Sequence, residues 1–336
     1  MIITGSYPNL RLRRSRKFSW SRRLVQDNDL SYNDFILPIF LTEGKAKKIP
    51  ISSMPNVFRY SIDKLKSVVD KALKLGIPMV ALFPYTNPKK KDEYGNEALN
   101  ENNLVCQAIK FIKKNYKNEI GIMCDVALDP YTSHGHDGII RKNEILNDET
   151  LEILIKQSIL QAKMGCDVIA PSDMMDGRVK IIREYLDKNG FEQVPIMSYS
   201  AKFASNFYGP FREASNSSPK SGSRSTYQLS FSNAREAMRE GQLDVEEGAD
   251  MLMVKPALSY LDIIYQFKLN YKLPIVAFNV SGEYFLVKSQ EKNTQFNNIE
   301  LAIEVLTSIK RAGADIIISY HALEIAKYIK ENNEIR

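Results

Sequence analysis

The sequence predicts an α/β protein, a (β/α)8 TIM barrel preceded by an extended N-terminal arm. Two observations carry this prediction: short apolar runs recur eight times along the chain, and longer amphipathic segments lie between them. Strands that alternate with helices form a parallel sheet covered on both faces, and eight such units in about 300 residues fit a barrel. An open doubly wound sheet is the alternative, but the chain has no GxGxxG or GxxxxGK phosphate loop.

The eight runs are the expected barrel strands. In chain order they are residues 35–41, 78–83, 120–128, 167–173, 195–202, 251–257, 274–282 and 315–322. Among the intervening helices, residues 148–164 have Asp148 as the expected N-cap and Gly165 as the expected end. A phrase of helix end, glycine, aspartate and strand recurs three times, at Asp167, Asp250 and Asp315. This recurrence is typical of successive helix–strand units.

We expect two parts, an N-terminal arm, residues 1–34, and a barrel domain, residues 35–336. The arm stretch RLRRSRKFSWSRR, residues 11–23, holds seven Arg or Lys and no acid, while the rest of the chain is about neutral. Composition alone leaves three interpretations open: a nucleic-acid patch, an organelle transit peptide, or a segment that packs on a partner subunit. We favour the third interpretation.

Composition also indicates a cytoplasmic protein without a membrane partner. No uncharged apolar stretch approaches the ~18 residues of a membrane-spanning helix. The three cysteines, Cys106, Cys124 and Cys166, are scattered, which predicts neither a disulfide framework nor a thiolate zinc site.

Polar residues end the predicted strands, which is the first functional signal. They are Asp125, Ser172, Asp173, Ser200, Lys202, Lys255, Ser281 and Tyr320. In a TIM barrel these ends converge at the C-terminal face, where the chemistry takes place. A serine-rich segment follows the fifth strand, and we expect residues about 205–228 to form a lid over that face.

Two of these residues are lysines on adjacent strands. Neighbouring parallel strands lie roughly 4.8 Å apart, so Lys202 and Lys255 are expected to lower each other's pKa, and burial adds to this effect. A lysine that is neutral near pH 7 attacks carbonyl carbon and forms a Schiff base. The alternative is a purely structural role, in which each lysine reaches the solvent at the barrel rim or pairs with a carboxylate.

The segments around both lysines resemble those of the 5-aminolevulinate dehydratase family, also called porphobilinogen synthases. The closest strings are SYSAKFASNFYGPFREA and MLMVKPALSYLDI. DVALDPYTSHGHDG, APSDMMDGR, VSGEY and the RLRR pattern of the arm are similar to further family segments in the same order. The resemblance runs from about residue 10 to residue 322.

The resemblance implies a hydro-lyase of tetrapyrrole (heme and porphyrin) biosynthesis. It would condense two molecules of 5-aminolevulinate asymmetrically into porphobilinogen with loss of two waters. Both substrates would be held as Schiff bases, the propionate-side molecule on Lys255 and the acetate-side molecule on Lys202. A class I Schiff-base aldolase on the same barrel is the alternative, and it would need only one nucleophilic lysine.

The resemblance also implies roles for the surrounding residues. Asp125 would orient a substrate amine or transfer a proton, and Phe278 stands where the family most often has a tyrosine. The remaining residues implied in substrate binding are Ser172, Arg212, Arg224, Gln228, Ser281 and Tyr320. Arginine suits the substrate carboxylate because its fork donates two parallel hydrogen bonds.

Magnesium is the expected metal, and zinc is not expected. Where many family members have three zinc-binding cysteines, this chain has Ala127, Asp129 and Asp137, and carboxylate oxygens suit Mg²⁺. Asp129 and Asp137 are therefore candidate active-site ligands, and Glu240 matches the glutamate of an allosteric magnesium site. The histidines of the HGH string, residues 134–136, are expected to be hydrogen-bonding residues and not zinc ligands.

The resemblance finally implies a self-assembly. In this family the arm wraps a neighbouring barrel, and arm-embracing dimers build a homo-octamer. The cations of the arm would then meet acids of a partner copy, and no nucleic-acid partner is expected.

Overall fold

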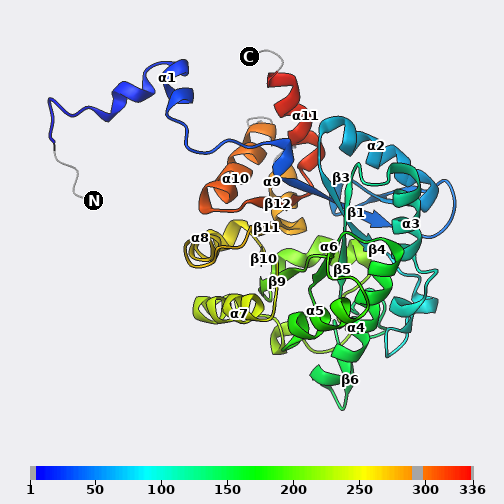
Figure 1. Ribbon diagram of the computed structural model, residues 1–336. Coiled ribbons are helices and arrows are strands. Elements are labelled where there is room, and N and C mark those ends of the chain that lie inside the picture. Colours follow the sequence, from blue (N-terminus) through cyan, green and yellow to red (C-terminus); the bar gives the residue numbers. More distant parts are fainter. Residues whose placement is uncertain (1–4, 290–297, 334–336) are drawn as a thin grey trace.

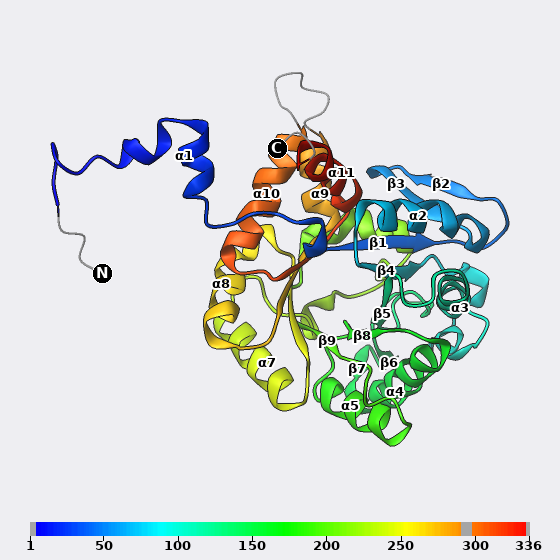
Figure 2. The same cartoon turned by 45° about the horizontal axis from the view of Figure 1, so that its top comes forward.

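The computed structural model describes residues 5–289 and 298–333, and its body is a barrel of eight parallel strands (Figure 1, Figure 2). The strands are β1 (Phe35–Leu41), β4 (Met79–Pro84), β5 (Gly121–Val126), β8 (Val168–Pro171), β9 (Met197–Lys202), β10 (Met251–Lys255), β11 (Ile275–Asn279) and β12 (Ile316–Ser319). Every predicted run contains most of one strand, so the TIM-barrel prediction is confirmed.

The strands follow the order β8-β5-β4-β1-β12-β11-β10-β9. The ring closes between β8 and β9, where Ile169 pairs with Ile196 and donates its N–H to the carbonyl of Pro195 at 3.1 Å. Every residue of β1, β8, β9 and β11 is buried. This burial on both faces explains why the strands read as continuous apolar runs.

Eight helices form the outer layer. They are α2 (Leu65–Leu75), α3 (Leu104–Tyr116), α4 (Asn147–Met164), α5 (Arg178–Lys188), α7 (Ala234–Glu246), α8 (Leu261–Asn270), α10 (Asn298–Ala312) and α11 (Ala322–Asn333). Helix α2 illustrates their patterning, since it buries Leu65, Val68, Val69 and Ala72 on one face. Two further helices, α6 (Gly209–Ser215) and α9 (Ser281–Ser289), follow β9 and β11 and contact each other.

The recurrent aspartate phrase has a structural cause. Each of the three aspartates accepts a backbone N–H at the start of a neighbouring strand: Asp167 from Ile122, Asp250 from Ile196 and Asp315 from Ile275, at 2.7–2.9 Å. The carboxylates therefore satisfy donors at the amino-terminal ends of the strands, opposite the predicted catalytic face.

The start of α4 differs from the prediction. The helix begins at Asn147 directly after a strand, so Leu146 occupies the cap position and Asp148 lies inside the first turn. Asp148 as N-cap is therefore wrong, although a carboxylate in the first turn still suits the helix dipole. Gly165 does end the helix, with φ of 102° in the left-handed region that favours glycine.

Two small hairpins were not predicted from the sequence. Strands β2 (Lys48–Ile51) and β3 (Met54–Tyr60) pair with each other, and β3 also pairs with β1. Strands β6 (Ile139–Arg141) and β7 (Glu144–Leu146) form a separate hairpin. Much of both hairpins is exposed, so neither shows the apolar run that marks a barrel strand.

The basic arm projects from the barrel (Figure 1). It contains a 3-10 helix (Leu12–Arg16) and α1 (Ser19–Leu24), and Ser21 is the one buried residue within residues 5–34. Its large apolar side chains between residues 7 and 25 are exposed, Trp20 by 58%, whereas Leu30 and Tyr32 pack against the barrel core. Residues 1–4 of the predicted arm, and 290–297 and 334–336 of the predicted barrel domain, lie outside the described residues. No helix in the described part of the chain is both long and apolar enough to cross a bilayer.

Candidate active site

The two lysines lie side by side at the carboxyl ends of β9 and β10. Lys202 and Lys255 are direct Cα partners in the parallel register. Both side chains are buried, with residue exposures of 4% and 6%. The backbone of β9 and β10 therefore brings two amines to one depth of the barrel.

The Lys255 amine lies among four aromatic rings. The ring centroids of Tyr199, Tyr208, Phe211 and Phe278 are 5.1, 5.4, 5.1 and 4.2 Å from Nζ. Burial, reinforced by the charge of the neighbouring lysine, lowers the pKa of Lys255 to about 7. A large fraction of this amine is therefore neutral near pH 7, as a Schiff-base nucleophile requires.

Lys202 has a different environment. Its Nζ lies 3.2 Å from Oδ1 of Asp137 and donates to the carbonyl oxygen of Ser172. The pair is therefore asymmetric, with one amine in an ion pair and the other against ring faces.

Asp125 supplies a carboxyl group beside the lysines. Burial raises the pKa of Asp125 to about 6, Lys202 and Lys255 oppose that rise, and Asp129 adds to it. Its Oδ1 has no hydrogen-bond partner among the described residues. A carboxyl group that titrates near neutrality can accept or donate a proton during the reaction.

Two arginines and a glutamine line a pocket of about 240 Å³ within the 205–228 segment, and neither lysine lines it. The Nε atoms of Arg212 and Arg224 and both amide atoms of Gln228 are buried without a partner in the described part of the chain. Buried donors without acceptors destabilise the ligand-free protein. A bound anion would accept hydrogen bonds from these donors. The pocket suits a carboxylate, which takes two hydrogen bonds from a guanidinium fork.

Arg224 also bridges the two candidate metal ligands. Its Nη2 lies 3.2 Å from Oδ2 of Asp129, and its Nη1 lies 3.1 Å from Oδ2 of Asp137. The Tyr227 hydroxyl donates to Oδ2 of Asp137 at 2.8 Å. Burial opposes ionisation, but the charges of Arg224 and Lys202 outweigh it and lower the pKa of Asp137.

This arrangement does not fit a bound cation between Asp129 and Asp137, because Arg224 already occupies the position of positive charge. Ala127 offers no side-chain ligand. Within residues 5–289 and 298–333, no group of three or more His, Cys, Asp or Glu side chains is placed to hold a metal ion.

The two hydroxyls expected to hold the second carboxylate differ in their contacts. The Ser281 hydroxyl accepts the N–H of Phe211 at 2.9 Å and donates to the carbonyl of Phe207 at 3.3 Å. It thus fastens the 205–228 segment to the barrel. The Tyr320 hydroxyl is buried without a partner among the described residues, and its ring stacks on Phe40 at 5.9 Å.

Glu240 lies on α7, outside the barrel, in a pocket of about 400 Å³. Acidic side chains dominate the lining together with Arg178 and Arg239; the acids are Asp176, Glu236, Glu240, Asp244 and Glu247. Burial and the nearby acids raise the pKa of Glu240, and Arg178 opposes that rise. The structure therefore separates Glu240 from the two lysines.

The histidines serve as hydrogen-bonding residues, as predicted. The two ring nitrogens of His136 contact the Tyr227 hydroxyl at 3.1 Å and the Ser221 carbonyl at 2.8 Å. Nε2 of His134 contacts the Glu93 carbonyl at 3.2 Å. His136 thus ties the 205–228 segment to the loop after β5, and His134 ties the same loop to the one after β4.

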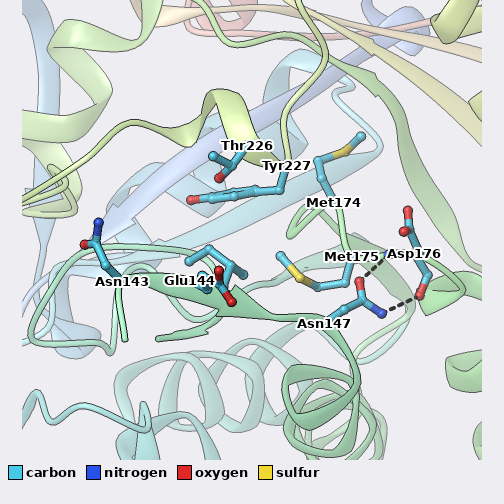
Figure 3. Close-up of a pocket in the computed structure, with 9 residues that line it drawn as sticks. Asn143, Glu144, Asn147, Met174, Met175, Asp176, Thr226 and Tyr227 are labelled. Atoms are coloured by element: carbon cyan, nitrogen blue, oxygen red, sulfur yellow. Dashed lines mark hydrogen bonds between the residues drawn. The ribbon is translucent and has the colours of Figure 1, made fainter. Parts of the chain in front are cut away.

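Another pocket, of about 410 Å³, lies beside Tyr227 but contains neither lysine. Figure 3 shows Thr226, Tyr227 and Met174 on one side of it and Asn143 and Glu144 of the β6–β7 hairpin on the other. It carries none of the groups needed for Schiff-base chemistry.

Four aromatic residues of the site were missed by sequence reasoning. They are Tyr199, Tyr208, Phe211 and Tyr227. Tyr199, Tyr208 and Phe211 lie inside the string SYSAKFASNFYGPFREA, so their density around Lys202 was a visible signal. Nothing in the string indicates that the rings surround Lys255.

Comparisons with known proteins show the family of this chain. The family model described as delta-aminolevulinic acid dehydratase matches residues 9–328. Delta-aminolevulinic acid dehydratase of Bradyrhizobium diazoefficiens is 50% identical over 322 residues, covering 96% of this chain and 91% of that protein. The Bacillus subtilis enzyme is 49% identical over 321 residues, covering 96% and 98%.

A solved structure extends the likeness to three dimensions. It is delta-aminolevulinic acid dehydratase (porphobilinogen synthase) from Toxoplasma gondii ME49 in complex with the reaction product porphobilinogen. Its TM-score is 0.94 at 43% identity, and the match covers 96% of this chain and 92% of that one. By full-length sequence match and by fold, this chain belongs to the delta-aminolevulinic acid dehydratase family of hydro-lyases.

Proposed function

We propose that this chain condenses two molecules of 5-aminolevulinate into porphobilinogen with loss of two waters, using Schiff bases on Lys255 and Lys202. The observation that carries the proposal is the pairing of these lysines in register, with the pKa of Lys255 lowered to about 7. A class I aldolase needs one such lysine, so a second lysine at the same depth argues against that alternative.

The chemistry begins at Lys255. Its neutral amine attacks the ketone carbon of one substrate, and loss of water leaves a Schiff base among the four rings. Phe278 is the nearest of these rings, at 4.2 Å. Asp125, with its pKa raised to about 6, is the group that takes and returns protons.

The second substrate binds at Lys202, whose amine forms the second Schiff base. Ser172 and Asp137 contact Nζ of Lys202 and hold the side chain in place. Arg212, Arg224 and Gln228 receive the carboxylate of this substrate. The first substrate directs its carboxylate toward Ser281 and Tyr320.

The 205–228 segment is proposed to act as a lid. It carries Arg212 and Arg224, and Ser281 fastens it through Phe207 and Phe211. Closure over substrate would exclude water from both Schiff bases, which hydrolyse in its presence.

Members of this family are metal-dependent in general. For this chain we propose Mg²⁺ and not zinc, because the positions of interest carry carboxylates. The acidic pocket of Glu240 supports an allosteric magnesium site there. Asp129 and Asp137 remain candidate ligands only for a state in which Arg224 has moved away.

We also propose a homo-octamer built from arm-embracing dimers, in the cytoplasm. The uncovered apolar side chains of the basic arm and the three free, buried cysteines support these two assignments. Light scattering tests the assembly: a Phe18→Ala, Trp20→Ala double variant should give smaller particles, and an unchanged mass would reject the role of the arm. Cell fractionation tests the location.

Incubation with 5-aminolevulinate as the sole substrate tests the reaction. The expected product is a pyrrole, detected with an acidic aromatic aldehyde reagent. Absence of a pyrrole at any concentration of protein and Mg²⁺ would reject the proposed function.

A further inference from the structure

A chain of buried polar groups links the loops that follow β10, β11 and β12. Its members are Asn279, Glu283, Ser319 and His321, all with 0% exposure. Three of the proposed reaction residues lie on the same loops or strand ends: Lys255, Ser281 and Tyr320. None of the four members is among the groups to which a role has been assigned above.

Glu283 is the centre of this chain. Its Oε1 accepts the N–H of Leu258 at 2.6 Å, three residues after Lys255. Its Oε2 accepts the N–H of Val280 at 2.8 Å and the side-chain amide of Asn279 at 3.1 Å. One fully buried carboxylate thus joins the loop after Lys255 to the end of β11, directly before Ser281.

The chain continues from β11 to β12. The Ser319 hydroxyl donates to Oδ1 of Asn279 at 2.9 Å and accepts the N–H of His321 at 3.1 Å. Tyr320 lies between these two residues, so its backbone is held on both sides. Its hydroxyl has no partner among the described residues, so packing and this backbone hold are what aim it.

The other side of Lys255 is held independently. Its carbonyl oxygen accepts the N–H of Phe203 at 2.9 Å and the hydroxyl of Tyr208 at 3.1 Å. Phe203 and Tyr208 therefore hold the backbone carbonyl of Lys255, and Glu283 holds the backbone three residues later, at Leu258. The Lys255 amine lies against aromatic rings and has no hydrogen-bond partner among the described residues. Hydrogen bonds of the amine therefore do not orient it.

We propose that Glu283 is a positioning residue that sets the placement of the Lys255 amine relative to Ser281 and Tyr320, acting through the Asn279–Ser319 link. This inference rests on the proposed roles of those three residues. A small displacement of a reacting group lowers rates far more than it lowers stability, which distinguishes positioning from ordinary packing.

Two variants test the two parts of this hydrogen-bonded series, the contacts of Glu283 and the link through Ser319. Glu283→Gln replaces one acceptor oxygen with a donor, which cannot accept from the N–H groups that face it. Ser319→Ala keeps Glu283 and removes the hydroxyl that joins β11 to β12. Asp315→Asn is the matched control, because Asp315 also accepts a backbone N–H of β11, at the opposite end of the same strand.

Steady-state kinetics of the folded holoenzyme with 5-aminolevulinate distinguish a positioning role from an effect on stability alone. Glu283→Gln is expected to lower kcat about 30-fold or more, with slower borohydride trapping at Lys255. Ser319→Ala is expected to raise KM about fivefold or more, with kcat within about twofold. Asp315→Asn should lower the unfolding midpoint and leave both constants within about twofold of the parent.

If Glu283→Gln folds and traps substrate at Lys255 as fast as the parent, the inference is wrong. If Glu283→Gln does not fold, Ser319→Ala decides: a lowered unfolding midpoint with unchanged KM would overturn the positioning role. Failure of the proposed function looks different, because the parent protein itself would then carry no borohydride label on Lys255.

Discussion

Lys202 and Lys255 are direct cross-strand partners, and their amines lie 5.9 and 5.1 Å from the centroid of one ring, that of Tyr199. Their second contacts are opposite in kind. Lys202 is paired with Asp137, while Lys255 lies against three more rings. Two chemically identical side chains thus have different surroundings, and burial among the rings lowers the pKa of Lys255 to about 7.

Replacement of Lys255 by Met is expected to abolish pyrrole formation without loss of the fold. Burial of this amine opposes its charged form and lowers its pKa to about 7, well below the ordinary value for lysine. Between those two pKa values the unfolded chain binds more protons than the folded chain, so removal of the amine should not lower the unfolding midpoint at neutral pH. Mass analysis after borohydride reduction should find substrate on Lys255 of the parent only.

The exposed Lys188→Met is the matched control for that variant and should retain activity. Turnover by Lys255→Met at the rate of the parent would defeat the assignment of Lys255 as the nucleophile.

The activity is expected to fall as the pH drops below about 7. The neutral form of Lys255 reacts, and its pKa is lowered to about 7, so acid converts the nucleophile to the inert ammonium. Asp125, raised to about 6, becomes protonated over an overlapping range and loses its function as a base. A profile of kcat/KM between about pH 5 and about pH 9 measures the acid limb.

In Asp125→Asn the fall of kcat/KM in acid should follow the ionisation of Lys255 alone, and the highest kcat/KM should be much lower than that of the parent. A kcat/KM that stays flat down to about pH 5 would mean that neither group titrates as described.

Replacement of Arg212 by Lys is expected to raise KM about tenfold or more, because lysine keeps the charge but loses the planar fork. Arg212 lines the 240 Å³ pocket, and its Nε has no partner among the described residues. Arg311→Lys, at an exposed position of α10, is the control. Steady-state kinetics with 5-aminolevulinate measure both, and an unchanged KM in Arg212→Lys would remove Arg212 from the carboxylate site.

A chelator is expected to lower activity, and Mg²⁺, but not zinc, is expected to restore it. Oxygen ligands select the harder cation, and the Glu240 pocket is lined by five carboxylates. Glu240→Gln should weaken the response to Mg²⁺ about tenfold or more in half-saturating concentration. Glu246→Gln, exposed on the same helix, should not. Restoration by zinc in place of Mg²⁺ would contradict the assignment.

Much of the site was predictable because its residues end strands. Asp125, Lys202 and Lys255 each end, or nearly end, a continuous apolar run, and a barrel brings such ends together. The surroundings of the candidate metal ligands were less predictable. Carboxylates at Asp129 and Asp137 indicate a positive partner, but the sequence does not say that Arg224, from the distant 205–228 segment, lies between them.

Tyr199 illustrates what periodicity misses. Strict alternation along β9 places Tyr199 and Lys202 on opposite faces, because they are three residues apart. The register between β9 and β10 shifts: Ser198 to Ala201 on β9 runs opposite Leu252 to Val254 on β10. That irregularity absorbs one extra residue, so Tyr199 and Lys202 reach the same space.

The amino-acid sequence by itself determined the alternation of eight strands and helices, the strand ends that carry chemistry, and the family, because each of these is written in contiguous residues. Only the tertiary structure decided which residues pair across strands. The closure at Ile169 and Ile196, the insertion of Arg224 between two aspartates and the hydrogen-bonded chain through Glu283 each join segments distant in sequence. Such contacts depend on the register and curvature of the whole barrel, which no local pattern specifies.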